Sequence, residues 1–329
     1  MKYSVIIPVY NRPAEVGELL ESIAGQPRPD VEIIIVEDGS QTTCEEVVAR
    51  FQNRLNITYL KKENGGPAAA RNYGAQQASG EWLIILDSDV VLPPGYFEAV
   101  DSGTENLGCD AFGGPDKAAD SFTPIQKAIS YAMTSFFTTG GIRGGKKKMD
   151  KFYPRSYNMG IRSEVYRKLG GFAKMRFGED IDFSYRIVEN GYKACLIPGA
   201  WVWHKRRTDF RKFFKQVHNS GIARINLEKR HPGTMKLVHM LPAAFTIGCL
   251  VFITGAFFCL WSFLPLMLYA LLVFLGSLAQ NKSLQVALLS VPAAFIQLTG
   301  YGTGFIVAAI RRYILKEKEF EAFKDNFYK

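Results

Sequence analysis

The first part of the chain alternates short, almost wholly apolar runs with segments that place apolar residues at helical spacing. The runs predict strands and the periodic segments predict helices. Strands that are apolar throughout are typical of a parallel sheet with helices on both faces. We therefore predict an α/β domain with strands at 3–10, 31–40, 57–62 and 81–89 and helices at 13–26, 44–52 and 66–78.

Polar residues stand where three of these predicted strands end. Ligands of such sheets bind beyond the carboxyl ends of the strands, so these positions are candidates for a site. The alternative for any one strand end is a turn or a helix cap, because Asn, Asp and Ser also serve there. The convergence of three ends favours a site formed by Asn11 and Arg12, Glu37 and Asp38, and Asp87, Ser88 and Asp89.

Asp87 and Asp89 are two residues apart at the end of an apolar run. In a continuing strand they would point to opposite faces, and they converge only if the chain turns between them. The sequence VVLPPG (90–95) follows at once, so we expect a turn. Carboxylate oxygens suit Mg²⁺ or Mn²⁺, and Mg²⁺ commonly completes its shell with substrate phosphates. The pair therefore predicts a divalent-cation site for a nucleotide diphosphate.

A second acidic pair, Glu179 and Asp180, begins a helix predicted at 178–192. The helix macrodipole favours acids in the first turn, so a capping role is one interpretation of this pair. A carboxylate that accepts a proton during catalysis is the other.

The last third of the chain is dominated by three uncharged stretches, at 241–260, 263–279 and 284–310. Each is near the ~20 residues that cross a bilayer. Buried helices of a soluble protein are the alternative, but three in a row would need a larger core than this chain can form. Three full spans would place the basic tail and the basic neck on opposite sides of the membrane, so either one segment is re-entrant, most readily in the Pro- and Gly-containing part 290–304, or the charge rule fails here. We also expect no signal peptide, which keeps the first domain cytosolic.

Positive charge is concentrated beside these apolar stretches. Residues 1–204 carry 23 basic and 25 acidic side chains, whereas residues 205–236 carry 10 basic and 2 acidic ones. This distribution argues against a nucleic-acid partner, which would require a basic patch on the folded body. Phenylalanines and lysines at helical spacing in 209–217 predict a helix lying in the interface of a lipid bilayer, on the cytosolic side. Residues 138–151 predict a mobile basic loop.

Six motifs in the order found here resemble those of the family 2 glycosyltransferases, whose fold is called GT-A. They cover residues 1 to about 204: VIIPVYNRP (5–13), IIIVEDGS (33–40), NGGPAAARN (64–72), LDSDV (86–90), NMGIR (158–162) and FGEDIDFSYRI (177–187). The resemblance implies a Rossmann-like, mostly parallel sheet with flanking helices, followed here by a C-terminal helical transmembrane region. It also implies a nucleotide-sugar donor, with a UDP-sugar favoured, and Mg²⁺ or Mn²⁺.

The resemblance also assigns roles to single residues. It places the donor at Pro8, Tyr10, Asn11, Asp38, Arg71, Asp87 and Ser88, the metal at Asp89 and His204, and catalysis at Asp180 and Glu179. We expect an inverting transfer to a hydroxyl of a glycan or lipid-linked acceptor at the membrane. The domains would be 1–204 catalytic, 205–236 a basic interfacial neck, 237–310 two to three transmembrane helices in the inner membrane, and 311–329 a basic tail.

Several alternatives stay open at this point. Transfer to a polyprenyl phosphate would need no general base, and a non-catalytic membrane scaffold would need only nucleotide binding. A nucleotidyltransferase would be expected to have a Gly-rich loop with a lysine after the first strand, and a Rossmann dehydrogenase a G-x-G-x-x-G there, but the chain has PVYNRPAEV. Processive synthases of the family carry Q-x-x-R-W, whereas Gln216 is followed by VHNSGIAR.

Overall fold

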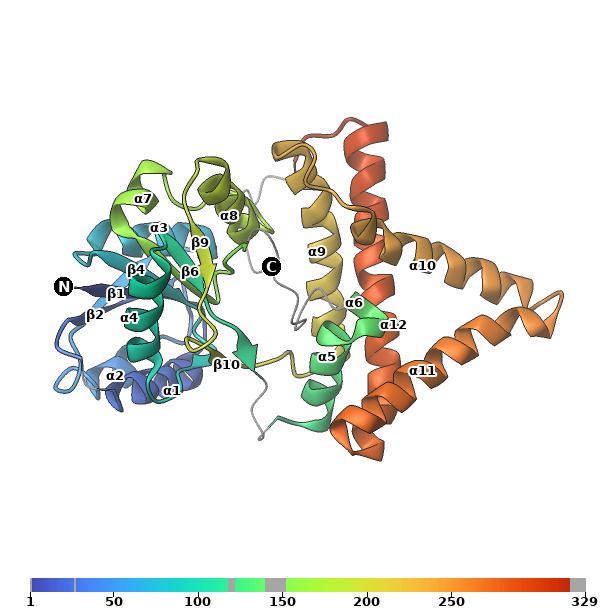
Figure 1. Ribbon diagram of the computed structural model, residues 1–329, viewed down its shortest axis with the longest axis horizontal. Coiled ribbons are helices and arrows are strands. Elements are labelled where there is room, and N and C mark those ends of the chain that lie inside the picture. The colour runs from blue at the N-terminus through green and yellow to red at the C-terminus, as the bar shows by residue number, and fades with distance from the viewer. Residues whose placement is uncertain (1, 27, 118–121, 140–151, 320–329) are drawn as a thin grey trace. The chain divides into compact units, whose positions relative to one another are not determined.

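The computed structural model describes residues 2–26, 28–117, 122–139 and 152–319. Packing divides these residues into two compact units, coloured by residue number in Figure 1. The first unit contains 2–117 and 152–205, and the second contains 122–139 and 206–319. Most of the loop predicted at 138–151 and the end of the tail predicted at 311–329 lie outside the described residues.

The first unit is built on a seven-stranded mixed sheet with the order β3-β2-β1-β4-β8-β6-β9. Neighbouring strands are parallel except that β8 runs antiparallel to β4 and to β6. The mostly parallel sheet is therefore confirmed. Its strands are β1 (Tyr3–Val9), β2 (Val31–Asp38), β3 (Ile57–Lys62), β4 (Trp82–Leu86), β6 (Ala111–Gly113), β8 (Asn158–Arg162) and β9 (Ala194–Leu196).

Helices cover both faces of this sheet, which explains why its central strands are apolar throughout (Figure 1). Successive residues of β1 alternate between two cores, since Val5 and Ile7 belong to one and Ile6 to the other. The first core includes residues of α1 (Pro13–Ala24), α2 (Glu45–Ala49) and α4 (Tyr96–Leu107). The second includes residues of α3 (Pro67–Gln77), α7 (Ser163–Lys168) and α8 (Glu179–Glu189).

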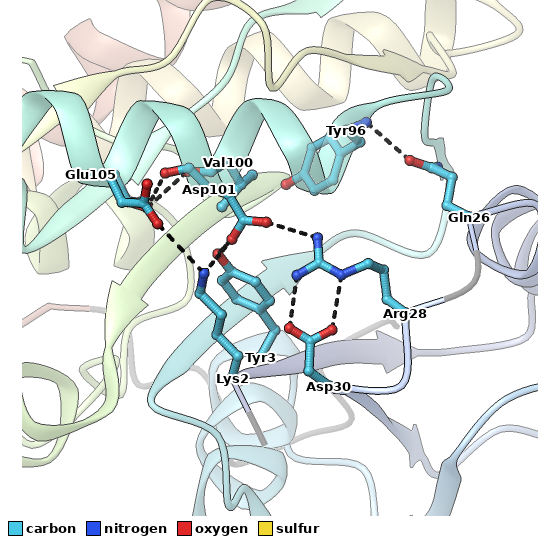
Figure 2. Close-up of polar contacts among 10 residues, drawn as sticks. Lys2, Tyr3, Gln26, Arg28, Asp30, Tyr96, Val100, Asp101 and Glu105 are labelled. Atoms are coloured by element: carbon cyan, nitrogen blue, oxygen red, sulfur yellow. Dashed lines mark hydrogen bonds and ion pairs between the residues drawn. The ribbon is translucent and has the colours of Figure 1, made fainter.

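A polar network stabilises the end of the sheet at which the central strand β1 begins (Figure 2). Arg28 binds Asp30 through two nitrogens, at 2.9 and 2.7 Å, and donates a third hydrogen bond of 2.9 Å to Asp101 of α4. The other oxygen of Asp101 accepts hydrogen bonds from Lys2 and from the Tyr3 hydroxyl, both at 2.5 Å. This network joins β1, the connection to β2 and α4 at the end of the sheet opposite to the predicted site.

The second unit is helical. Its core is formed by small and apolar side chains of α5, α9 and α12, among them Ile129, Phe213, Val217 and Val286. Of the apolar residues that predicted an interfacial helix at 209–217, Phe213 and Val217 are buried in this core, whereas Phe214 is 40% exposed. The elements are α5 (Pro124–Thr134), α6 (Phe136–Thr139), α9 (Phe210–Arg230), α10 (Leu237–Gly255), η1 (Leu260–Phe263), α11 (Leu264–Asn281), α12 (Leu284–Ala309) and η2 (Ile310–Ile314).

The expectation of irregular backbone at 290–304 is wrong, because α12 runs unbroken through it. The glycines of this stretch instead allow other helices to approach closely. A Cβ on Gly304 would lie 2.0 Å from the backbone oxygen of His218 in α9, and one on Gly302 would lie 2.3 Å from the backbone oxygen of Pro242 in α10. The glycines therefore form a packing surface of a continuous helix.

Two helical stretches of the described chain, 260–281 and 284–314, are long and apolar enough to cross a membrane, and 241–255 is a shorter apolar helix. Three such stretches were predicted. Within the second unit, α10 and α11 form a hairpin (Figure 1). Its tip exposes four large apolar side chains, each more than three-quarters accessible: Phe257, Phe258, Leu260 and Trp261.

Candidate active site

The strand β4 ends at Leu86, and the chain turns at once. The amide of Val90 donates to the carbonyl of Asp87 at 3.3 Å, which closes a turn over Ser88 and Asp89. Ser88 and Asp89 are buried in this turn, and Asp87 is half-buried. The predicted turn therefore forms, and it removes the opposite orientation that a continuing strand would impose on the two aspartates.

A three-stranded sheet brings His204 to this turn. The two-residue strand β5 (Val90–Val91) pairs antiparallel with β10 (Val202–His204), and the register sets His204 opposite Val90; the third strand is β7 (Asp116–Lys117). His204 Nε2 lies 3.2 Å from Asp89 Oδ1. Possible ligand atoms of Asp87, Asp89 and His204 all lie within 4.8 Å of one another.

The ring of Tyr157 holds the imidazole of His204 from one side. The two rings are stacked, with centroids 5.0 Å apart and planes inclined by 23°. The Tyr157 hydroxyl donates a hydrogen bond of 3.2 Å to the backbone oxygen of Gly114. The backbone carbonyl of Tyr157 accepts a long hydrogen bond of 3.4 Å from the amide of Asp87. Tyr157 was not singled out from the sequence, although it directly precedes the NMGIR motif.

Arg12 is the other partner of the buried Asp89. It directly precedes α1 without capping it through its side chain, and its Nη1 donates to Asp89 Oδ2. Burial opposes ionisation of Asp89, but His204 and Arg12 outweigh it and hold the pKa of this carboxyl well below its usual range. From the sequence, Arg12 was predicted to lie at a strand end of the site, but no binding or catalytic role was predicted for it.

Arg71 links this group to the second acidic pair. It projects from α3, is 4% exposed, and donates from Nη2 to Asp87 Oδ1 at 2.9 Å and from Nη1 to Glu179 Oε1 at 2.8 Å. Gly66 directly precedes α3 and Gly178 directly precedes α8, with φ of 85° and 86°, values that strain other residues. These two helix starts aim Arg71 and Glu179 toward the same point.

Glu179 and Asp180 have different surroundings in the first turn of α8. Burial raises the pKa of Glu179 above its usual value, although Arg71 acts in the opposite direction. Burial also opposes ionisation of Asp180, but Arg155 Nε donates to Asp180 Oδ2 at 2.7 Å and lowers the pKa overall. Asp180 Oδ1 accepts a bond of 2.9 Å from the amide of Ile181. The pair is therefore split into a readily ionised Asp180 and a Glu179 that resists ionisation. Arg155, like Tyr157, was missed in the sequence.

Two of the predicted donor-binding residues organise loops at the mouth of the sheet. The buried Asp38 carboxylate accepts from the amides of Gly65 and Gly66, at 2.9 and 2.8 Å, and pairs with Lys62 at 2.6 Å. Asn11, with φ of 54°, accepts from the amides of Gln41 and Thr42 at 2.8 and 3.0 Å. Both side chains thereby fix the loops that surround the site.

The remaining two, Pro8 and Tyr10, lie at the end of β1 and are partly buried. The register pairs Pro8 with Val36 of β2. The structure thus brings Asp87, Asp89 and His204 together and joins Asp87 through Arg71 to Glu179, which is followed by Asp180. Pro8, Tyr10, Asn11 and Asp38 lie at the neighbouring strand ends.

Comparison with known proteins identifies the family. Residues 4–170, just over half of the chain, match the model of glycosyl transferase family 2. An uncharacterized glycosyltransferase of Haemophilus influenzae is 31% identical over 194 residues, which are 56% of this chain and 62% of that protein. The poly(ribitol-phosphate) beta-N-acetylglucosaminyltransferase TarS of Staphylococcus aureus is 39% identical over 93 residues, 27% of this chain and 16% of TarS. Each match spans less than two thirds of the relative's length.

Solved structures show the same fold. The mannosyltransferase PcManGT from Pyrobaculum calidifontis, in complex with GDP-Man and Mn²⁺, aligns with a TM-score of 0.64 and 18% identity over 90% of this chain and 87% of that one. Residues 1–349 of TarS align with a TM-score of 0.51 and 18% identity over 95% and 92%. The chain therefore belongs to glycosyl transferase family 2 and has the GT-A fold of that family.

Proposed function

We propose that this protein transfers a sugar from a nucleoside-diphosphate donor to an acceptor hydroxyl, with inversion at the anomeric carbon. One observation carries the proposal: Asp87, Asp89 and His204 cluster with possible ligand atoms within 4.8 Å of one another, and Arg71 joins Asp87 by hydrogen bonds to Glu179, the neighbour of Asp180. Relatives solved with GDP-Man and Mn²⁺ or with UDP-GlcNAc support a donor of this class.

The side chains at the turn fit a divalent cation. Two carboxylates offer the oxygen ligands that Mg²⁺ and Mn²⁺ prefer, and an imidazole nitrogen beside them favours Mn²⁺ of the two. Asp87, Asp89 and His204 would hold the ion. A bound ion would stabilise, as a Lewis acid, the negative charge that grows on the departing diphosphate.

Asp180 is the proposed general base. It removes the proton of the acceptor hydroxyl while that oxygen forms a bond to the anomeric carbon. The bond from this carbon to the diphosphate breaks at the same time, and the diphosphate leaves with the electron pair. A single displacement inverts the anomeric centre. Arg155 lowers the pKa of Asp180 and so keeps the carboxylate ionised, the form that accepts a proton.

Glu179 and Arg71 position charge for this reaction. Arg71 is buried and held from two sides, so its guanidinium presents a fixed positive charge beside Asp87 without losing energy to reorganisation. Pro8, Tyr10 and Ser88 contribute to the donor-binding surface. Asn11 and Asp38 shape it through the loops that they tether.

The acceptor is proposed to lie at the cytosolic face of a membrane, as a glycan or a lipid-linked glycan. The exposed apolar hairpin of α10 and α11 supports membrane association, since an apolar surface of this extent is costly in water. Basic residues concentrated in 205–236 support the cytosolic side.

A donor panel tests the proposal. The purified full-length protein is incubated with UDP-, GDP- and dTDP-sugars, with Mn²⁺ or Mg²⁺, and release of nucleoside diphosphate is measured with and without EDTA. We expect turnover with one nucleotide, loss of turnover in EDTA, and loss in Asp89→Asn. Glu45→Gln removes an exposed carboxylate that pairs with Lys61 at 2.5 Å, and it should keep full activity.

The same panel separates the alternatives. Full activity in EDTA would contradict the proposal that transfer depends on a divalent cation. Nucleotide binding without turnover for any donor supports the scaffold. Transfer to a polyprenyl phosphate that survives Asp180→Asn supports the lipid-phosphate acceptor, because an ionised phosphate oxygen needs no base.

A further inference from the structure

The carboxylate of Asp89 is satisfied on both oxygens by groups from distant parts of the chain. His204 lies against Oδ1 and Arg12 donates to Oδ2. Asp89 is 7% exposed, and a buried carboxylate that lacked these partners would be strongly destabilising. The two partners therefore allow the cation-binding carboxylate to be buried in the folded protein before any cation arrives.

The two partners differ in what they can do when a cation arrives. A neutral imidazole has a lone pair on one ring nitrogen and can join the coordination shell, whereas a guanidinium has five N–H donors and no acceptor. Arg12 consequently has no form that can share Asp89 with a cation, whereas His204 can share it once the proton on Nε2 is lost or moves to Nδ1, which has no hydrogen-bond partner.

We propose, building on the function proposed above, that Arg12 is an exchangeable counter-ion. It neutralises Asp89 in the absence of a divalent cation, yields that carboxylate to the cation, and then binds the donor diphosphate. A fork of N–H donors matches phosphate oxygens well, so the displaced guanidinium has a new partner on the substrate.

The local structure permits this exchange. The side chain of Arg12 is 33% exposed, whereas that of Arg71, the other arginine of the site, is 5% exposed and fixed between two acids. The backbone beside Arg12 is anchored, because Asn11 accepts from the amides of Gln41 and Thr42 and α1 begins at Pro13. The guanidinium can therefore move by side-chain rotation while the chain stays in place.

Mn²⁺ binding without nucleotide tests the first half of the proposal. Binding to the full-length protein is followed by electron paramagnetic resonance of free Mn²⁺ and by calorimetry. Arg12→Gln should bind Mn²⁺ about tenfold more tightly than the parent, the gain expected when one charged competitor is removed. Arg12→Lys keeps the charge and should bind with parental affinity. Asp89→Asn should not bind.

Lys205→Gln is the matched control for net charge. Lys205 directly follows His204, and its ammonium pairs with Glu18 at 2.7 Å. Its backbone amide donates to the carbonyl of Asp89 at 3.1 Å, a bond that glutamine keeps. Loss of the ammonium removes the same charge from the same neighbourhood and should change Mn²⁺ affinity less than twofold. If Lys205→Gln and Arg12→Gln tighten binding equally, the effect is general electrostatics and the proposal is wrong.

Nucleoside diphosphate binding at saturating Mn²⁺ tests the second half. Arg12→Gln should weaken binding of UDP or GDP, whichever the parent binds, by about tenfold, whereas Lys205→Gln should not. Equal Mn²⁺ affinity of parent and Arg12→Gln overturns this inference alone. If neither protein binds Mn²⁺, the metal-dependent function falls as well. Thermal melting of each variant establishes that it is folded.

Discussion

The substitution Arg71→Met tests whether the positive charge of Arg71 allows the carboxylates of Asp87 and Glu179 to be buried at the site. Methionine has nearly the length of the arginine stem and keeps its apolar packing, but it removes both hydrogen bonds, to Asp87 and to Glu179. Asp87 and Glu179 are then left largely buried without the guanidinium that neutralises them. We expect the variant to fold, to lose stability, and to lose activity.

The magnitude follows from the burial of the three side chains. Removing one partner of a buried charge pair typically costs about 3–5 kcal/mol. Glu179 is 12% exposed and bears that cost in full, whereas Asp87 is 30% exposed and regains water. We therefore expect a loss of about 3 kcal/mol, near the lower end of that range. For a unit of this size, this lowers the melting temperature by roughly 6–12 °C.

The loss should depend on pH in a defined direction. Burial already raises the pKa of Glu179 above its usual value of 4.5, and Arg71 opposes that rise. A carboxyl whose pKa is raised by folding destabilises the fold as pH increases from the unfolded value through the folded one. Without Arg71 the pKa of Glu179 rises further and the penalty grows. The variant and the parent should therefore converge as the pH falls toward 4.5 and differ most at neutral pH.

Melting is followed through tryptophan fluorescence at a series of pH values from neutral down to about 4.5, the usual Glu value. Arg71→Lys is the control, since an ammonium restores the charge but cannot reach both acids in a fork; we expect it to recover about half of the loss. A melting temperature of Arg71→Met within about 2 °C of the parent, or a difference that widens toward low pH, would refute this account of the site.

Three further changes have defined outcomes. Asp180→Asn should lower the turnover number by about 10²–10⁴-fold and leave Mn²⁺ affinity in calorimetry unchanged; loss of metal binding would mean that the side chain is structural. Gly304→Ala should destabilise by about 1–3 kcal/mol in thermal melting, because its Cβ would lie 2.0 Å from a backbone oxygen of α9, whereas Gly248→Ala meets nothing closer than 3.9 Å and should be neutral or stabilising. Asp101→Ala should lose about 2–3 kcal/mol at neutral pH with Mn²⁺ affinity unchanged, because Lys2 and Tyr3 lose their shared acceptor while Arg28 keeps only Asp30. Burial opposes but does not prevent the lowered pKa of Asp101, so the deficit should shrink as the pH falls from its usual value of 3.8 through the lowered folded pKa.

The sequence predicted the parts of the fold that depend on neighbouring residues. Apolar runs identified β1, β2 and β4, and the aspartates after Leu86 marked the turn, because strand period and turn chemistry are local properties. The site residues on strand ends follow from the rule that carboxyl ends of parallel strands meet at one edge. The contact of Asp89 with Arg12 spans 77 positions, and that with His204 depends on the register of two very short strands, so neither could be derived from local pattern.

The helical unit shows the opposite limit. Pro and Gly in 290–304 indicate irregular backbone when each is considered alone, but Gly304 is required by the approach of α9. In 209–217, the sequence does not show that α5, about eighty residues earlier, supplies Ile129 and Met133 to the core that buries Phe213 and Val217. Phe214 is 40% exposed, and the interfacial position of this helix stays a prediction. Tertiary partners decide such faces, and they are distant along the chain.

The order in which the two units alternate along the chain has a consequence for synthesis. The segment 122–139 belongs to the helical unit but is translated before β8, which lies in the middle of the sheet. The ribosome therefore releases α5 before α9 and α12 have been synthesised. The sheet cannot be completed until β8, which follows α5 in the chain, has also been synthesised. The apolar face of α5 stays exposed until Phe213 has been synthesised, more than seventy residues later; this face consists of Ala128, Ile129, Ala132 and Met133. A fragment that ends at Lys205 would keep that face exposed permanently, and we expect it to aggregate or to require a chaperone, whereas deletion of α5 and α6 with a short splice should yield a tractable sheet domain.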